Sequence, residues 1–226
     1  MKDFQIVQRL NLIEQECSGK KVLHLGCTNY PYTSEAINGG NLLHLLLKEK
    51  CSELYGFDDD QNGLDILSQH GCTNLFKANL EELGSVPLDE TFDVIVAGEI
   101  IEHLNNPGLF LSGIKRFIGP KTKLIITTVN AYCGFRFALY ALNGKRGRNE
   151  QIHPDHVAYY SYSTLSVLLN RYDLKIENFL YYDLGTEHRP YSRWFVNFIN
   201  DCLVKFTPQL ADGVIAICRL PNSAEK

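Results

Sequence analysis

The sequence predicts an α/β domain in which a mostly parallel sheet of seven strands carries helices on both faces. Short apolar runs typical of strands alternate with stretches of helical spacing along the chain. The run FDVIVA at residues 92–97 is almost continuously apolar, as a parallel strand buried on both faces should be. Strands that alternate with helices form parallel sheets because each helix returns the chain to the same end of the sheet. The length of 226 residues fits a single domain over residues 1–226.

The seven strands are expected at residues 21–25, 53–57, 74–77, 92–97, 123–128, 174–182 and 213–219. Helices are expected at residues 4–17 (within an N-terminal helical segment 1–19), 42–47, 61–70, 107–117, 163–172 and 194–206. Asn41 is a candidate N-cap for the second of these helices, because its side chain can accept a hydrogen bond from the first turn. Residues 131–160, between the fifth and sixth strands, are irregular. Loops at the carboxyl ends of such strands build ligand sites, so we expect this insertion to be a small substrate cap.

Composition narrows the classes of function. The net charge is −4 and the pI about 6.0, so no broad positive field favours nucleic acid, and the basic stretch at residues 145–148 reads as a solvated loop. Seven cysteines without a Cys-x-x-Cys pair argue against a disulfide framework and a structural zinc site, and suit a reducing cytoplasm. No apolar run of signal-peptide type opens the sequence, and no run reaches the ~20 residues that a membrane span needs.

Three positions match the needs of a nucleotide-like ligand at the edge of the sheet. Gly26 follows the first strand, where a tight turn lets backbone N–H groups approach a ligand. Asp58 ends the second strand, where a carboxylate can accept hydrogen bonds from both hydroxyls of a ribose. Asn79 follows the third strand, and its amide can donate and accept toward an adenine edge.

These motifs identify a family. The segments VLHLGC, LYGFDDD, ANLEEL, FDVIVAGEIIEHLNNPGLFL and KRFIGPKTKLIITTVNAY, over residues 20–131, resemble class I methyltransferases that depend on S-adenosylmethionine (SAM). The segment 92–111 is the most specific, and is similar to ubiquinone-type O-methyltransferases and to enzymes of surface-polysaccharide clusters. The resemblance implies a Rossmann-like fold, SAM as cofactor and a small-molecule acceptor. The cofactor contacts that it implies are Gly26, Cys27, Thr28, Asp58, Asp59, Asn79, Leu80, Ala97 and Glu99.

The first motif departs from the family pattern. His24 stands where the family has an acidic residue, and Thr28 and Tyr30 stand at the second and third glycine positions. Two interpretations stay open. The long loop that follows can wrap SAM differently, with Gly39 and Gly40 supplying flexible backbone. Alternatively, the cofactor site is lost, and the protein is a non-catalytic binding protein of the same fold.

A methyltransferase acting on a hydroxyl benefits from a general base. The candidates are His156, which matches the histidine of a DHxxxYS-like element in this branch, and His153. The alternative is that His156 holds the cap through hydrogen bonds. His44, within an apolar helix, is expected in the core, although a role at the cofactor stays open.

Glu99, Glu102 and His103 have the i, i+3, i+4 spacing that places side chains on one face of a helix start. The resemblance to small-RNA 2′-O-methyltransferases, which use an E-x-x-E-H helix and a later histidine, implies a divalent cation with His156 as a further ligand. The alternative is that Glu102 and His103 stabilise the turn without a metal.

The function expected is therefore SAM-dependent O-methylation of a small polar acceptor, such as a sugar or a natural-product intermediate. The alternatives are a metal-dependent 2′-O-methyltransferase of nucleic acid, which the acidic net charge disfavours, and a non-catalytic protein of this fold. The acceptor, the atom methylated and the oligomeric state stay open.

Overall fold

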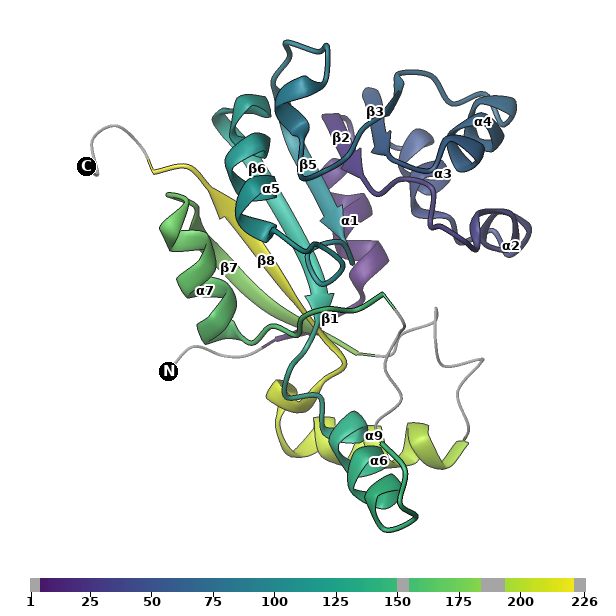
Figure 1. Ribbon diagram of the computed structural model, residues 1–226, viewed down its shortest axis with the longest axis vertical. Coiled ribbons are helices and arrows are strands. Elements are labelled where there is room, and N and C mark those ends of the chain that lie inside the picture. The colour runs from purple at the N-terminus through teal and green to yellow at the C-terminus, as the bar shows by residue number, and fades with distance from the viewer. Residues whose placement is uncertain (1–4, 150–154, 184–193, 222–226) are drawn as a thin grey trace.

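The computed structural model describes residues 5–149, 155–183 and 194–221. Its centre is one eight-stranded sheet in the order β1-β7-β8-β6-β5-β2-β3-β4 (Figure 1). Only β8 runs antiparallel to its neighbours β6 and β7. The seven expected strands are confirmed, and an eighth, β1, is added at the edge. The strands are β1 Ile6–Val7, β2 Lys21–Leu25, β3 Glu53–Asp58, β4 Leu75–Lys77, β5 Phe92–Gly98, β6 Ile118–Val129, β7 Lys175–Tyr182 and β8 Gly213–Arg219.

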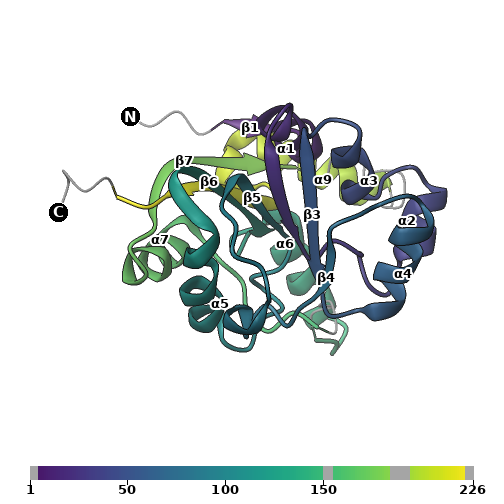
Figure 2. The ribbon, with the colours of Figure 1, turned by 90° about the horizontal axis from the view of Figure 1, so that it is seen from above.

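Helices cover both faces of the sheet (Figure 2). On one face, α1 (Arg9–Cys17) and α3 (Leu43–Lys48) bury Ile13 and Leu47 against β2, β5 and β8. On the other face, α5 (Pro107–Ile114) and α7 (Tyr162–Arg171) contribute to the larger core. Ser161 begins α7 with a capping box, because its side chain accepts from the Thr164 N–H while the Thr164 hydroxyl accepts from the Ser161 N–H.

Sheet order creates a topological switch point between β2 and β5, the position that open α/β sheets use as a ligand crevice. From β2 the chain moves outward to β3 and β4, and then returns past β2 to β5 and β6. The connections on the two sides of β2 therefore diverge at the carboxyl ends of β2 and β5, and ligands of open α/β sheets bind at such a switch point. Gly26 and Gly98 lie there.

Several boundaries differ from the expected ones. Ile6–Val7 is not helical, because it pairs with β7 as an edge strand, and α1 begins only at Arg9. Asn41 does not cap α3, whose N-cap is Leu42 without a side-chain hydrogen bond. The expected helix 107–117 is divided: the α-helix α5 ends at Ile114, and the next three residues form the 3-10 turn η2 (Lys115–Phe117). The long first loop holds a helix that periodicity missed, α2 (Thr33–Asn38), and α4 (Gln61–Gln69) packs beside it.

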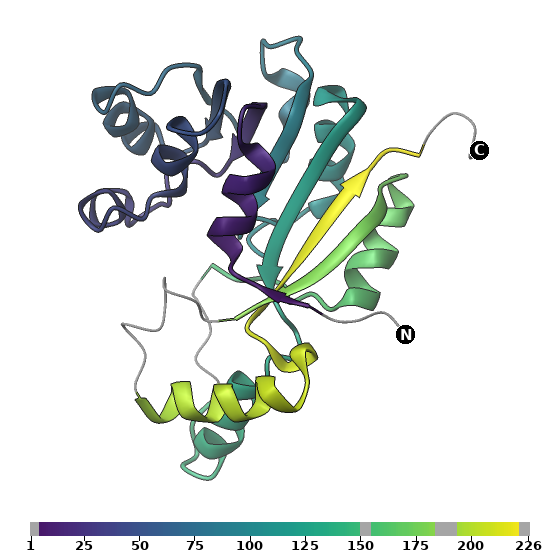
Figure 3. The same cartoon turned by 180° about the vertical axis from the view of Figure 1, so that it is seen from behind.

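The insertion after β6 closes at its base, where Asn130 and Tyr160 form a bridge and the Ala131 N–H donates to the Tyr160 carbonyl at 2.9 Å. It holds α6 (Gly134–Gly144). A second segment, α9 (Trp194–Phe206), lies beside α6 beyond the carboxyl ends of the central strands (Figures 1 and 3). We call residues 131–149 and 194–212, which hold α6, α9 and the 3-10 turn η3 (Pro208–Leu210), the cap. Its role over a substrate stays a prediction. Among the described residues, no helix is long and apolar enough to cross a membrane.

Candidate active site

The first loop turns sharply at Gly26, which directly follows β2. Its φ of +68° lies in the left-handed region that side chains other than glycine rarely adopt. Its N–H donates to the Phe57 carbonyl at 2.8 Å, and a Cβ here would lie 2.1 Å from Cδ1 of Ile100. Glycine is therefore favoured both by backbone conformation and by the close approach of the turn after β5.

Asp58 joins the first loop to the end of β3. One carboxylate oxygen accepts from the Thr28 N–H at 2.9 Å, and the other accepts from the Asp60 N–H at 3.0 Å. Burial raises the pKa of Asp58 although these hydrogen bonds favour the ionised form. The Thr28 hydroxyl is also buried and has no hydrogen-bond partner within the described structure. A polar ligand at this loop would meet the Asp58 carboxylate.

The other expected cofactor residues follow the neighbouring strands. Asn79 is exposed after β4, with its side-chain oxygen accepting from the Glu81 N–H, and Leu80 beside it is buried. Asp59 is exposed, whereas Ala97 is fully buried. The sheet thus brings the strand ends together as expected. Asn79 and Asp59 expose polar side chains there, whereas the side chains of Leu80 and Ala97 are buried.

Cys27 contributes only backbone to this edge. Its side chain is fully buried with Ala36 and Leu64 in a small core, and burial raises the pKa of its thiol. A Cβ on Gly56 would lie 2.8 Å from the Cys27 sulfur, so the thiol packs tightly against β3. A cofactor contact at Cys27 would therefore come through its main chain.

His24, at the position where an acidic residue was expected, pairs with His44. Their Nδ1 atoms lie 3.2 Å apart, and their rings stack with centroids 5.4 Å apart. Burial is the main cause that lowers both pKa values, that of His44 to about 4. Two neutral imidazoles can form this hydrogen bond, because the Nδ1–H of one ring donates and the unprotonated Nδ1 of the other ring accepts.

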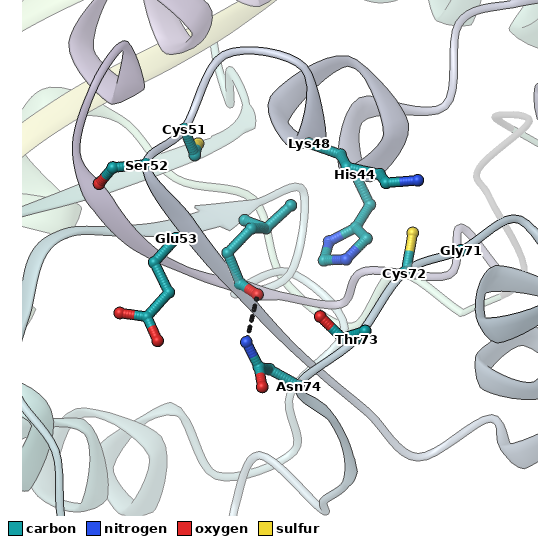
Figure 4. Close-up of a pocket in the computed structure, with 10 residues that line it drawn as sticks. His44, Lys48, Cys51, Ser52, Glu53, Gly71, Cys72, Thr73 and Asn74 are labelled. Carbon is teal, nitrogen blue, oxygen red and sulfur yellow. Dashed lines mark hydrogen bonds between the residues drawn. The ribbon is translucent and has the colours of Figure 1, made fainter.

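The expected core position of His44 is thus supported, while its Nε2 has no partner among the described residues. The His44 ring borders a pocket that Ser52, Glu53 and Lys48 also line (Figure 4). Glu53 begins β3, whereas Asp58 ends it, so this pocket lies at the opposite edge of the sheet from the crevice. His44 therefore does not contact the predicted cofactor position.

Glu99 is tied to strands β6 and β7. One of its carboxylate oxygens accepts from the Thr127 hydroxyl at 2.8 Å and from the Tyr182 hydroxyl at 2.7 Å. Its φ of +55° is unusual for a residue other than glycine, and the Glu99 N–H donates to the Thr127 carbonyl at 3.0 Å. Burial raises the pKa of Tyr182 well above its usual range, so this phenol stays a donor to Glu99.

Glu102, His103 and His156 come together under the connection to the cap. Their potential ligand atoms lie within 4.8 Å of one another, and the two imidazole rings meet edge to face with centroids 4.7 Å apart. The Val157 N–H donates to the Glu102 carbonyl at 2.9 Å, which holds the segment of His156 against the turn after β5. The prediction from the E-x-x-E-H spacing was wrong in two respects. The segment is a turn rather than a helix, and Glu99 is not part of the cluster, since its carboxylate accepts from Thr127 and Tyr182.

Glu102 is the polar centre of this cluster. It is fully buried, and its Oε2 accepts from the Thr128 hydroxyl at 2.9 Å. Burial, and next the charge of Glu99, raise its pKa to about 8. Its Oε1 has no partner among the described residues, and a buried unpaired carboxylate oxygen is costly unless a proton or a ligand reaches it. The arrangement can therefore hold a proton or a cation.

Two arginines that the sequence did not single out lie near this edge. Arg9, at the start of α1, lies over the Tyr182 ring at 5.9 Å, and its Nη1 would be 3.5 Å from a Cβ at Gly98. Arg136 in α6 forms an ion pair with Asp212 at 2.6 Å. A lone arginine in a helix carries no signal of such a position, because only the tertiary structure brings α1 to the end of β5. His153, the other expected base, lies outside the described residues.

Comparisons with known proteins agree with the family that the motifs indicate. A methyltransferase domain model matches residues 7–178. The chain is 27% identical over 151 residues to a ubiquinone biosynthesis O-methyltransferase of Coxiella burnetii, covering 64% of this chain and 59% of that protein. A mitochondrial ubiquinone biosynthesis O-methyltransferase of Schizosaccharomyces pombe is 27% identical over 123 residues, with 52% and 41% covered. The matched region thus spans about three fifths of the first relative and less of the second.

Solved structures share the fold at low sequence identity. A SAM-dependent methyltransferase of Mesorhizobium loti superposes with a TM-score of 0.58 at 13% identity, covering 93% of this chain and 95% of its own. One of Archaeoglobus fulgidus gives 0.55 at 21%, covering 93% and 90%. The [4+2]-cyclase SpnF gives 0.57 at 15%, covering 94% and 80%, so the fold alone does not specify methyl transfer. Because the domain model matches most of the chain and its motifs lie at the strand ends as expected, this chain belongs to the class I SAM-dependent methyltransferase family.

Proposed function

We propose that the protein transfers the methyl group of SAM to an oxygen of a small polar acceptor. The observation that carries the proposal is the cluster of Glu102, His103 and His156, which lies at the same edge of the sheet as Gly26 and Asp58. In this proposal the cluster supplies the proton acceptor beside the predicted cofactor. The names of the relatives, which are O-methyltransferases, support oxygen as the atom methylated.

The residues present fit SAM at the crevice. The Asp58 carboxylate would accept from the ribose hydroxyls while it holds the Thr28 N–H of the first loop. Asn79 and Leu80 would flank the adenine. Arg9, close to Gly98 in the switch-point crevice, is placed to attract the methionine carboxylate. SAM supplies a methyl group on a positively charged sulfur, which is already a good leaving group.

The protein's own task is then to align the acceptor oxygen and to remove its proton. His156 is the proposed base, because its imidazole lies in the cluster, edge to face with the His103 ring, and imidazoles commonly serve as general bases. His153 stays a second candidate from the sequence. Glu102, buried next to both imidazoles, would orient them through its carboxyl group.

A second version of this chemistry adds a divalent cation. The ligand types of Glu102, His103 and His156 suit a transition-metal ion, and the unpaired Glu102 oxygen is the observation that favours it. A cation there would lower the pKa of an acceptor hydroxyl and favour acceptors with two adjacent oxygens. Such acceptors include sugars and, as the nucleic-acid alternative, a terminal ribose. The net charge of −4 supports the small acceptor.

Calorimetric titration with S-adenosylhomocysteine, the demethylated product of SAM, tests the first step. We expect micromolar binding, and its absence at millimolar ligand would reject the cofactor assignment and favour the binding-protein alternative. Methylation of a panel of catechols and sugars, with and without a chelator, tests the second step. If product forms only in the absence of the chelator, the result supports a bound cation. Equal rates with and without the chelator reject the cation. Cofactor binding without any methylated product across the panel would leave SAM as a bound ligand and reject the transfer to these acceptors.

A further inference from the structure

Helix α9 is apolar on two opposite faces. Its inner face packs Val196 and Ile199 against Cys133 and Phe135 of the other cap segment. On its outer face Trp194, Phe198, Cys202 and Phe206 recur at every fourth position, and we call these four residues the α9 stripe. Trp194 is 80% exposed, Phe198 63% and Phe206 85%. A surface helix normally turns polar residues to water, and a contiguous apolar surface of this kind indicates a partner.

The charge of the cap restricts what this partner is. The described cap segments 131–149 and 194–212 carry five basic residues and two acidic ones, in a chain whose net charge is −4. One of the acidic residues, Asp212, is already paired with Arg136. Lys145, Arg146 and Arg148 are exposed in the turn that ends α6. The cap is therefore a positively charged part of an acidic protein.

A second copy of this chain is a poor match for this surface, because a two-fold contact would bring two basic caps together. A layer of anionic lipid matches both of its properties: an apolar interior for the aromatic rings and negative headgroups for the basic residues. With 13 residues at ~1.5 Å each, α9 is too short to cross a bilayer and would lie in its plane.

We propose that the α9 stripe docks the cap onto an anionic membrane surface, with the basic turn 145–148 contacting lipid headgroups. The aromatic rings enter the boundary between headgroups and acyl chains, where Trp is favoured. The body of the domain stays in water, since the inner face of α9 keeps its packing on α6. Docking would hold the cap side of the candidate site at the membrane.

Trp194 is the only tryptophan of the chain, so its fluorescence reports directly on the α9 stripe. Vesicles of phosphatidylcholine alone and vesicles with about one third phosphatidylglycerol are titrated into the protein, and binding is measured in parallel by cosedimentation. We expect a blue shift and cosedimentation with the anionic vesicles, weakened in high salt because the charges are then screened. No methyl donor is present, so the outcome does not depend on the proposed function.

Two variants separate the apolar and the charged contributions. Phe198→Ser with Phe206→Ser should weaken vesicle binding at least about tenfold, since two large apolar side chains lose their burial in lipid. Reversal of charge by Lys145→Glu, Arg146→Glu and Arg148→Glu should weaken it about a hundredfold, at ~1 kcal/mol for each basic residue at the surface. The matched control is Leu109→Ser with Val167→Ser, which removes two other exposed apolar side chains on α5 and α7 and should bind like the wild type.

Three results would overturn the proposal. The first is no shift of Trp194 and no cosedimentation with anionic vesicles. The second is binding that the control pair weakens as much as the Phe198 and Phe206 pair. The third is a blue shift without vesicles that grows with protein concentration together with a dimeric mass, which would assign the α9 stripe to a second copy of the chain.

Discussion

The two halves of the candidate active site differ in how their polar groups are satisfied. In the half formed by β2, β3 and the first loop, both Asp58 oxygens accept loop N–H groups, and His24 pairs with His44. In the half formed by β5 and the cap connection, Glu102 keeps one buried oxygen unpaired beside two imidazoles. The carboxylate of the first half is therefore held at both oxygens by backbone N–H groups, whereas the carboxylate of the second half depends on a proton, an acceptor or a cation at its unpaired oxygen.

The largest effect is expected from removal of the proposed base. We expect His156→Ala to lower kcat by about 10²–10⁴-fold, because proton removal from a hydroxyl acceptor loses its catalyst. Binding of S-adenosylhomocysteine should stay near that of the wild type, since His156 belongs to the cap connection. Equal losses of kcat and of cofactor affinity would show that the two halves do not act separately.

Removal of the carboxylate that joins β3 to the first loop should act on the other half. Asp58→Ala removes the carboxylate proposed to accept from both ribose hydroxyls, at roughly 1.5–3 kcal/mol for each hydrogen bond to a charged acceptor, and it releases the Thr28 and Asp60 N–H groups, so cofactor affinity should fall about a hundredfold or more. The matched control is Asp59→Ala, one residue further along and exposed. Calorimetry of both variants decides, and a similar loss in the two would contradict the assignment of Asp58.

The pair of buried histidines makes the first half sensitive to acid. Burial lowers the pKa of His44 from 6.5 to about 4 and that of His24 well below 6.5. Between pH 6.5 and about 4 these two histidines therefore bind fewer protons in the folded chain than in the unfolded one. The stabilisation is complete above about pH 6.5 and is lost as the pH falls toward 4, with a slope of up to about 1.4 kcal/mol per pH unit for each histidine. Urea unfolding at several pH values measures it, and a His44→Phe variant should show a shallower dependence. The same pH dependence in the wild type and in His44→Phe between pH 6.5 and 4.5 would contradict the neutral pair, since the other buried groups are shared by both proteins.

The smallest effect expected is at the first turn. Gly26→Ala places a Cβ at a positive φ and against the end of Ile100, so the free energy of unfolding should fall by roughly 1–2 kcal/mol. Gly84→Ala is the control, since a Cβ there meets no atom within 4 Å and its φ is not positive. Thermal unfolding of both compares them, and a larger loss in Gly84→Ala would show that the turn at Gly26 is not strained.

Local patterns in the sequence were sufficient to predict seven of the eight strands and the positions of Gly26 and Asp58 at the strand ends. Alternating apolar runs predicted seven strands, and Gly26 and Asp58 lie at the same edge because parallel strands end together. The edge strand β1 was missed, since two residues carry no periodicity and their pairing with β7 is a long-range contact. The E-x-x-E-H spacing predicted one helical face, but the segment is a turn, so Glu99 bonds to Thr127 and Tyr182 instead.

Taken alone, the sequence determined the fold class, the family and the residues at the strand ends, because these depend on periodicity and on order along the chain. Only the tertiary structure decided which side chains meet: His24 with His44, Glu102 with His156, Arg9 with the end of β5, and α6 with α9. The physical reason is that each of these contacts joins segments far apart in the chain, whose approach depends on how helices pack on the sheet. The exposed face of α9 belongs to this second group, because its amphipathic spacing did not reveal which apolar face would stay uncovered.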